Sequence, residues 1–332
     1  MKELWLPFYT TPLGAAYLGD SLDLLDNLDD GSVNLVLTSP PFALTRKKEY
    51  GNEQEEAYIE WFLPFAKKVF NVLKDDGSFV IDLGGAYIPG SPVKSLYQYE
   101  LLLRLCKELG FFLAQDFFHY NPSRLPAPAE WVNVRRCRVK DSVNTVWWLS
   151  KTPWPKSDNR NVLNEYSNSM KSLLKNGYKA KMRPSGHDIS TKFSKDNGGS
   201  VPSNVLGLAS LDPSNLLVAA NTESNSSYLR MCKEHGYKPH PARFPSYFAE
   251  FFIKFLTEPG DMVVDIFAGS NTTGYVSEVL ERKWQAFELS RDYLEASALR
   301  FELADKELMP EPVKLGGLFA LERVKKYAAG EN

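Results

Sequence analysis

The 332-residue sequence has only three cysteines, Cys106, Cys137 and Cys232, and only four histidines. An odd number of widely separated cysteines excludes a disulfide framework and favours a reducing compartment. These cysteines and histidines also lack the spacing of metal ligands, so no metal is expected. The formal net charge is −2. Any binding to a polyanion must therefore depend on local basic patches.

Long hydrophobic runs are missing as well. No stretch approaches a membrane span, and the N-terminus lacks the basic-then-apolar layout of a signal peptide. We therefore expect no membrane association and a cytoplasmic location. With 43% hydrophobic and 24% charged residues, the composition is typical of a soluble globular chain. Its length allows one large domain, or one domain with an insertion.

Apolar runs of strand length alternate with helical patterns in two parts of the chain. We expect strands at 33–39, 77–83, 111–120, 143–150, 261–267 and 284–289, and helices at 56–74, 95–110, 246–259, 272–283 and 291–307. This alternation predicts an α/β fold, doubly wound, with a mostly parallel sheet and helices on both faces.

Residues 151–239 lose this periodicity and are dominated by polar residues, Gly, Pro and Asn. Such a texture predicts an inserted region or a small second domain built largely from loops. Residues 1–150 and 240–332 would then form the two halves of one domain.

The first informative motif is "LVLTSPPF", in which an apolar strand ends at Ser39-Pro40-Pro41-Phe42. Two prolines have fixed φ and no N–H donor, so they make a rigid turn. Parallel sheets bind ligands at the carboxyl ends of their strands, which is where this turn lies. By itself the motif favours two prolines that merely end a strand. Asp82 closes the neighbouring strand and is either a turn cap or a polar group of a site.

The second motif is "VVDIFAGSNTTG" at 263–274, in which a strand ends at Asp265 and a helix begins after Gly269. The next strand ends at Glu288, about 20 residues beyond the turn, where nucleotide-binding sheets hold a ribose hydroxyl. A full G-x-G-x-x-G is absent, which disfavours a dinucleotide. An adenosine-bearing ligand without a pyrophosphate fits better.

Together, "TSPPF" and "DIFAGSNTTG" resemble the motifs of the DNA amino-methyltransferases. The order, with the Pro-Pro motif first and a polar insertion before the glycine turn, is similar to the beta class. Stretches such as "RPSGHDI" and "HPARFP" resemble cytosine-N4-specific members of restriction–modification systems. The likeness spans about residues 15–305 and implies a Rossmann-like methyltransferase sheet with permuted motif order.

The resemblance implies S-adenosylmethionine as cofactor and double-stranded DNA as partner. It also implies a restriction endonuclease on a separate chain and a bacterial, nucleoid-associated location; the oligomeric state stays open. The chain is expected to hold no nuclease domain. Likeness in the middle region makes CAGCTG the expected recognition sequence.

Roles for individual residues follow from the same resemblance. Ser39 and the Pro40 carbonyl would accept hydrogen bonds from the target amine, Pro41 would fix the turn, and Phe42 would stack on a flipped base. Asp82 would accept a hydrogen bond or relay a proton. The cofactor would be held by Asp20, His240, Phe244, Asp265, Phe267, Gly269, Asn271, Thr272 and Glu288. A helix cap is the alternative for Asp20, and a structural proline-rich turn is the alternative for His240 and Phe244.

Basic residues recur in three clusters that would contact phosphates. The expected DNA-binding residues are Arg46, Lys47, Lys48, Arg135, Arg136, Lys181, Arg183 and His187, with Asn197 a further candidate near the base. Solvated surface is the alternative for all of them.

Four other functions are alternatives to a cytosine-N4 methyltransferase. A 5-methylcytosine enzyme is excluded because no cysteine follows a proline. A nucleotide-dependent oxidoreductase leaves the Pro-Pro motif unused. A non-catalytic DNA-binding protein leaves the paired motifs unexplained. An adenine-N6 enzyme of the same class stays open, although Ser39 resembles the cytosine enzymes, since adenine enzymes mostly place Asp or Asn there.

Overall fold

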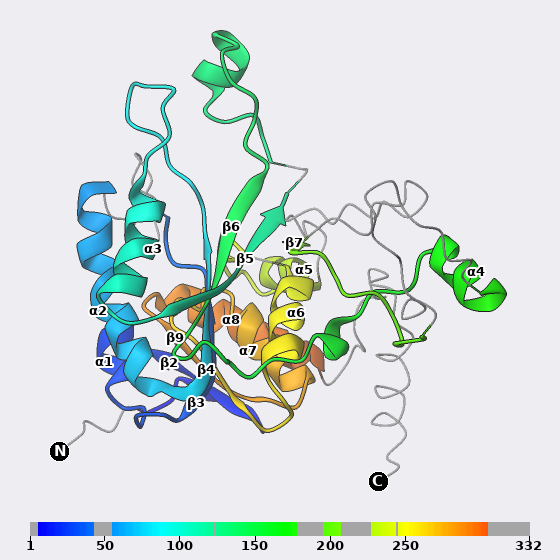
Figure 1. Cartoon of the computed structure of the whole chain (residues 1–332). Helices are drawn as coiled ribbons and strands as arrows, with labels where there is room; N and C mark the ends of the chain where they lie inside the picture. Colours follow the sequence, from blue (N-terminus) through cyan, green and yellow to red (C-terminus); the bar gives the residue numbers. More distant parts are fainter. Residues whose placement is uncertain are drawn as a thin grey trace.

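The computed structural model describes residues 6–42, 55–121, 124–177, 195–206, 227–243 and 245–304. Within these residues the strands form one nine-stranded sheet in the order β1-β2-β9-β8-β3-β4-β6-β5-β7 (Figure 1). The strands are β1 (Tyr9–Thr10), β2 (Gly14–Leu18), β3 (Val33–Thr38), β4 (Leu73–Leu83), β5 (Phe112–Tyr120), β6 (Val143–Ser150), β7 (Val205–Leu206), β8 (Met262–Asp265) and β9 (Lys283–Glu288).

The central strands β2, β9, β8, β3 and β4 run parallel to their neighbours. β1 is antiparallel to β2, and β6 is antiparallel to both β4 and β5. The two-residue strand β7 extends the edge parallel to β5. The predicted mostly parallel α/β sheet is therefore confirmed.

Helices cover both faces of the sheet (Figure 1). They are α1 (Ser21–Leu25), α2 (Glu55–Val72), α3 (Tyr97–Lys107), α4 (Asn168–Asn176), α5 (Ser227–Glu234), α6 (Ser246–Leu256), α7 (Thr272–Val279) and α8 (Arg291–Ala304), with a π-helix η1 (Glu130–Val134) and a 3-10 helix η2 (Asn159–Val162). One core cluster joins α1, α2 and α3 to the sheet, and a second joins α6 and α7 to the opposite face. All six residues of β3 are buried because the strand is covered on both sides.

The order of the strands creates a switch point between β8 and β3. From β8 the chain crosses through α7 to β9 on one side, whereas from β3 it crosses through α2 to β4 on the other. α2 remains one helix although it contains Pro64. Diverging crossovers leave a crevice at the carboxyl ends of the two strands, and open α/β sheets bind ligands there.

Parts of the middle segment join the main body. β7 pairs with β5, and the amide of Asp158 donates to the carbonyl of Phe255 in α6 at 2.8 Å. Tyr228 and Cys232 of α5 are buried in a cluster with α8. The described parts of 151–239 include helices as well as loops, and the boundaries at 150 and 239 stay predictions. Among the described helices, none is long and apolar enough to cross a membrane.

Candidate active site

Ser39 and Asp82 lie opposite each other at the carboxyl edge of the sheet. The β3–β4 register pairs Thr38 with Ile81, so the next residue of each strand follows in register. The hydroxyl of Ser39 donates to the main-chain carbonyl of Asp82 at 3.2 Å. Because its one proton is used there, this hydroxyl can act toward other groups only as an acceptor. The predicted proximity of these two residues is confirmed.

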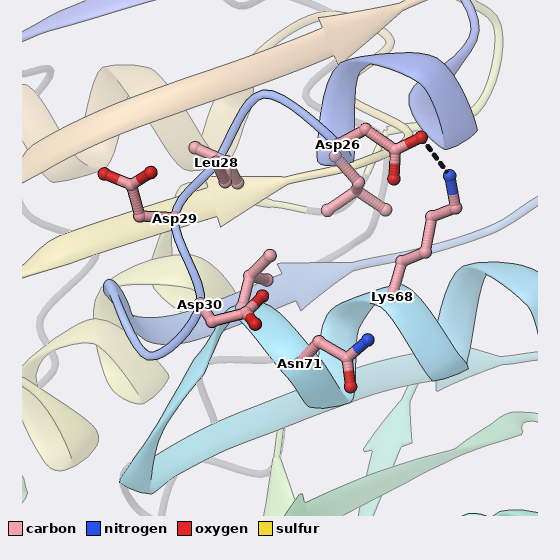
Figure 2. Close-up of a pocket in the computed structure, with 8 residues that line it drawn as sticks. Asp26, Leu28, Asp29, Asp30, Lys68 and Asn71 are labelled. Carbon is pink, nitrogen blue, oxygen red and sulfur yellow. Dashed lines mark hydrogen bonds and ion pairs between the residues drawn. The ribbon is translucent and has the colours of Figure 1, made fainter. Parts of the chain in front are cut away.

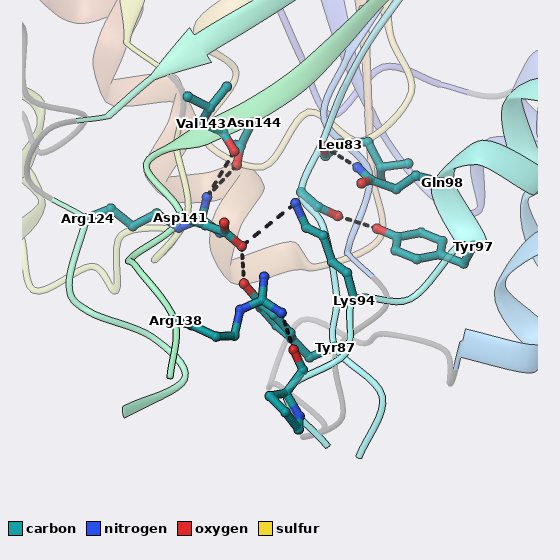
Figure 3. Close-up of polar contacts among 12 residues, drawn as sticks. Leu83, Tyr87, Lys94, Tyr97, Gln98, Arg124, Arg138, Asp141, Val143 and Asn144 are labelled. Carbon is teal, nitrogen blue, oxygen red and sulfur yellow. Dashed lines mark hydrogen bonds and ion pairs between the residues drawn. The ribbon is translucent and has the colours of Figure 1, made fainter. Parts of the chain in front are cut away.

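Side chains from α3 hold the chain just after Asp82. Gln98 donates to the carbonyl of Leu83 at 2.7 Å, and the hydroxyl of Tyr97 donates to the carbonyl of Gly84 (Figure 3). The ring of Phe42 lies directly against Gly84, where an added Cβ would be 2.5 Å from the ring. Because Gly84 has no side chain, the ring of Phe42 can lie directly against its backbone.

Asp265 ends β8 and is buried, with 2% of its surface exposed. Its Oδ1 accepts from Thr38 Oγ1 at 2.7 Å and from the amide of Phe267 at 3.1 Å, and its Oδ2 accepts from Thr273 Oγ1 at 2.7 Å. Burial raises its pKa from 3.8 to about 6, against the opposing effect of these hydrogen bonds. Both oxygens are thus engaged within the protein, so the carboxylate fixes the turn and the β3–β8 junction.

Glu288 ends β9 and holds the glycine turn. Its Oε2 accepts from the amide of Gly269 at 2.7 Å and its Oε1 from the amide of Ser290 at 2.8 Å. Burial raises the pKa of this carboxyl. Gly269 has φ of +53°, a left-handed conformation in which glycine carries no Cβ penalty. Glu288 thus ends its strand next to the glycine turn, and its predicted contact with ribose hydroxyls stays a prediction.

His240 lies against the same turn. A Cβ on Gly269 would be 3.2 Å from the His240 ring, which also packs edge-on against Tyr293 with a centroid distance of 4.5 Å. Burial lowers the pKa of His240 to about 4, so the imidazole is neutral near pH 7. Phe267 packs against aromatic rings of α2, with centroid distances of 5.7 Å to Trp61 and 5.2 Å to Phe65. Phe244 lies outside the described residues.

Three other predicted cofactor residues have structural roles. Asn271 is fully buried, caps α7 by accepting from the amide of Gly274 at 3.0 Å, and donates to Tyr9 at 2.8 Å. Thr272 is buried beside Ser270. These two side chains shape the turn from inside, and their place beside a ligand stays a prediction. Asp20 caps α1 by accepting from the amide of Leu22 at 2.8 Å; a further role toward a ligand stays a prediction.

The basic residues differ in their surroundings. Arg135 and Arg136 are exposed in the long β5–β6 connection, and Arg135 pairs with Glu130 at 2.7 Å. Arg138 stacks on Tyr87 and ties this connection to the loop after β4 (Figure 3). Both segments rise beyond the sheet in Figure 1. The remaining predicted DNA contacts lie outside the described residues: Arg46, Lys47, Lys48, Lys181, Arg183 and His187.

Sequence reasoning missed two residues beside Asp82. His119 of β5 places Nδ1 3.8 Å from Asp82 Oδ2, and its Nε2 lies 3.0 Å from the hydroxyl of Tyr247 in α6. Asp82 Oδ1 and His119 Nδ1 are buried without a hydrogen-bond partner in the part of the chain that the structure describes. The only signal in the sequence was a histidine near the end of an apolar strand. Such a residue is usually part of the core.

A surface hollow of about 380 Å³ lies elsewhere (Figure 2). Asp26, Asp29 and Asp30 line it, and Lys68 pairs with Asp26 at 2.6 Å. The three aspartates precede the start of β3, whereas Ser39 follows the other end of that strand. The hollow therefore belongs to the opposite edge of the sheet. Over the described residues, no cluster of three His, Cys, Asp or Glu side chains is arranged to hold a metal.

Known proteins resemble this chain over most of its length. The family model described as "DNA methylase" matches residues 33–299. The chain belongs to the DNA methylase family. The type II methyltransferase M.PvuII of Proteus hauseri is 57% identical to this DNA methylase over 298 residues, which cover 89% of the chain and 85% of M.PvuII.

Solved structures agree with the fold of this DNA methylase. The structure named PvuII DNA methyltransferase (cytosine-N4-specific) matches with a TM-score of 0.70 and 46% identity, covering 98% of this chain and 96% of that one. The Thermus thermophilus protein TTHA0409, complexed with S-adenosyl-L-methionine, matches with a TM-score of 0.53 and 16% identity, covering 88% of this chain and 95% of that one. The latter likeness is one of fold alone.

Proposed function

We propose that this DNA methylase transfers a methyl group from S-adenosylmethionine to the exocyclic N4 amine of a cytosine flipped out of duplex DNA. One arrangement at the carboxyl ends of the strands carries the proposal. Ser39 donates to the carbonyl of Asp82, and the amide of Gly269 in the glycine turn donates to Glu288. The cytosine-specific name of the PvuII enzyme, a relative at 57% identity, supports cytosine as the acceptor.

The residues at the ends of β8 and β9 fit S-adenosylmethionine. Glu288 is the acidic group suited to ribose hydroxyls, and the left-handed Gly269 lets the backbone approach a ligand closely. His240 is neutral and lines the other side of the turn. When bound, the cofactor supplies a sulfonium methyl group. Asp20, at the end of the adjacent β2, extends this site toward the adenine.

Ser39 and Pro40 activate the amine. The amine lone pair is conjugated with the cytosine ring and is therefore a poor nucleophile. Ser39 Oγ, whose proton is donated to Asp82, is one acceptor, and the Pro40 carbonyl is a second acceptor on the same rigid turn. Hydrogen bonds from the two N–H groups to these acceptors draw the nitrogen out of the ring plane and direct its lone pair at the methyl carbon.

The transfer releases one proton, which Asp82 accepts. A bond forms between the amine nitrogen and the methyl carbon, while the carbon–sulfur bond breaks with its electron pair passing to sulfur. The nitrogen then carries a positive charge and loses a proton. Asp82 Oδ1 lacks a partner among the described residues and is positioned to take it. Phe42, packed on Gly84, provides a flat surface for the extruded base.

The recognition sequence that we propose is CAGCTG, with a cognate restriction endonuclease as a separate chain. The likeness of the middle region, given in the sequence analysis, supports the recognition sequence, and the name of the relative M.PvuII, a type II methyltransferase, supports the restriction partner. The exposed Arg135 and Arg136 of the β5–β6 connection contact phosphates of the duplex in this proposal.

The test combines two measurements on plasmid DNA from cells that express this chain. Nucleoside mass spectrometry should find N4-methylcytosine, and modification-sensitive sequencing should place it within CAGCTG. A Ser39→Ala chain serves as the control and should leave the plasmid unmodified. N6-methyladenine without N4-methylcytosine would overturn the choice of acceptor, and a different modified sequence would overturn the proposed site alone.

A further inference from the structure

His119 shares one face of the sheet with Asp82. Asp82 is in register with Val146 of β6, and Val146 is in register with Phe117 of β5. His119 follows Phe117 by two residues, and side chains two apart on a strand point to the same face. Only 1% of the surface of His119 is exposed. The imidazole is therefore buried behind the carboxylate.

Tyr247, at the start of α6, holds the far side of the imidazole. Its hydroxyl lies 3.0 Å from His119 Nε2. The ring of Phe248 packs on the imidazole with a centroid distance of 5.1 Å. One ring nitrogen is thus fixed by a hydrogen bond, and the other faces Asp82 at 3.8 Å.

Two neighbours face the imidazole of His119, the carboxylate of Asp82 at Nδ1 and the phenol of Tyr247 at Nε2. Burial, together with the nearby charge of Asp82, raises the pKa of this phenol well above its usual range. A neutral phenol can donate to Nε2 of His119 or accept from it, so this contact is compatible with either tautomer of the imidazole. Of the two tautomers of a neutral imidazole, the one with its proton on Nδ1 presents a donor to the Asp82 carboxylate and leaves Nε2 to accept from Tyr247.

We propose that His119 and Tyr247 are positioning residues of the methyl transfer, which orient Asp82 to receive the proton of the target amine. The inference rests on the proposed function, in which Asp82 is the proton acceptor. At 3.8 Å the Nδ1–Oδ2 distance is longer than a hydrogen bond, and catalytic hydrogen bonds commonly tighten when the substrate binds. With Oδ2 held by His119, Oδ1 is directed at the substrate.

The kinetic test compares two substitutions that each preserve one half of the imidazole. His119→Asn keeps a donor near the Nδ1 position, whereas His119→Gln keeps only a group near Nε2. Single-turnover methylation of a CAGCTG duplex at saturating cofactor should slow about a hundredfold in His119→Gln, and at least about tenfold less in His119→Asn. Tyr247→Phe should slow it about three- to thirtyfold.

In all three variants the cofactor Kd should stay within about twofold of wild type, measured by calorimetric titration. His235→Gln and Tyr99→Phe alter exposed residues and serve as matched controls. Equal rates in His119→Gln and His119→Asn, or wild-type rates in both, would overturn the inference. Neither outcome would overturn the proposed function, which stands as long as the wild-type chain produces N4-methylcytosine.

A spectroscopic test does not depend on activity. With only four histidines, ¹⁵N-histidine NMR spectra of the whole chain are simple, and the His119 signals are those lost in His119→Gln. They should show the Nδ1–H tautomer, and Asp82→Asn should shift the Nδ1 resonance. An Nε2–H tautomer, or a spectrum indifferent to Asp82→Asn, would overturn the inference even if the wild-type chain methylated no DNA.

Discussion

The hydroxyl of Thr38 donates a 2.7 Å hydrogen bond to Asp265 Oδ1 and so joins β3 to β8 across the switch point. Thr38 is the residue before Ser39, and Asp265 is two residues before Phe267. One buried contact therefore sets the Pro-Pro motif in position relative to the glycine turn. The two motifs are over 220 residues apart in the chain, yet the proposed transfer requires their ligands to meet at one point.

Thr38→Val should test the energy of this contact, because valine has nearly the same shape and lacks the hydroxyl. Leaving a buried acceptor without one of its donors costs about 1–3 kcal/mol. We expect the free energy of unfolding, measured in urea, to fall by about that amount. Thr10→Val, at an exposed position of β1, is the control and should change it by less than about 0.5 kcal/mol. Equal effects of the two substitutions would show that the Thr38–Asp265 hydrogen bond does not stabilise the fold.

The raised pKa of Asp265 predicts a pH dependence of stability. A carboxyl whose pKa is about 6 when folded and 3.8 when unfolded binds more protons in the folded state between those values. Its contribution to stability is therefore fully present below pH of about 4 and is lost as the pH rises through about 6. The rise of this pKa from 3.8 to about 6 corresponds to about 3 kcal/mol in the free energy of unfolding.

Asp265→Asn removes this titration and is the matched variant. The unfolding free energy of the wild type minus that of Asp265→Asn should decrease by about 3 kcal/mol between pH of about 4 and 7. Urea titrations at several pH values measure it. A difference that is flat or increases with pH would show that the Asp265 pKa is not raised in the folded state.

Much of this arrangement could be predicted from the sequence. The apolar runs at 33–39 and 143–150 match β3 and β6 to within one residue, because burial of all of β3 and of the last five residues of β6 leaves an apolar pattern in the sequence. The turns after Thr38 and Asp265 were predicted from proline and glycine. These residues restrict or extend the backbone in ways that do not depend on the rest of the fold.

Other features depend on tertiary contacts and left no local signal. β2 reads "GAAYL", and its first residue, Gly14, is explained by the indole of Trp284, which would lie 2.3 Å from a Cβ at that position. β4 begins at Leu73 rather than at Gly77, because Leu73 pairs with Val33. The side-chain amide of Asn271 donates to the hydroxyl of Tyr9, which is near the other end of the chain, so no local pattern predicts this contact.

Lesions of Glu288 and Ser39 should separate cofactor binding from turnover. Glu288→Ala removes the acceptor for the amides of Gly269 and Ser290 as well as any bond to a ribose. The Kd for S-adenosylmethionine should rise about tenfold or more, with a smaller rise in Glu288→Gln. Ser39→Ala should leave that Kd within about twofold while it abolishes most turnover. Calorimetric titration that gave the reverse pattern would reject both assignments.

The contact between Phe42 and Gly84 predicts different effects at two adjacent glycines. A Cβ at Gly84 would be 2.5 Å from the Phe42 ring, whereas a Cβ at Gly85 would be 3.0 Å from the flexible end of Lys94 and 3.4 Å from Gln98 Oε1. Gly84→Ala should displace the ring and slow methylation at least about tenfold, and Gly85→Ala should slow it less than about threefold. Fluorescence of 2-aminopurine at the target position would report base extrusion in each variant. Equal rates would exclude a role for Phe42 in holding the base.

The last prediction concerns the salt dependence of DNA binding. The net charge of −2 would repel a polyanion weakly, so affinity must come from local cations. Each phosphate contact releases counterions and contributes about −0.9 to the slope of log affinity against log salt. Arg136 is exposed, so Arg136→Gln should reduce the magnitude of the slope by about 1.

Arg104 of α3 provides the control for this measurement. Its guanidinium is held by Glu60 and Glu108, so Arg104→Gln removes ion pairs within the protein and should leave the slope unchanged. Fluorescence anisotropy of a labelled duplex, titrated at several salt concentrations, gives the three slopes. If Arg136→Gln and Arg104→Gln change the slope alike, the β5–β6 connection does not contact phosphates, and the cations that bind DNA lie elsewhere in the chain.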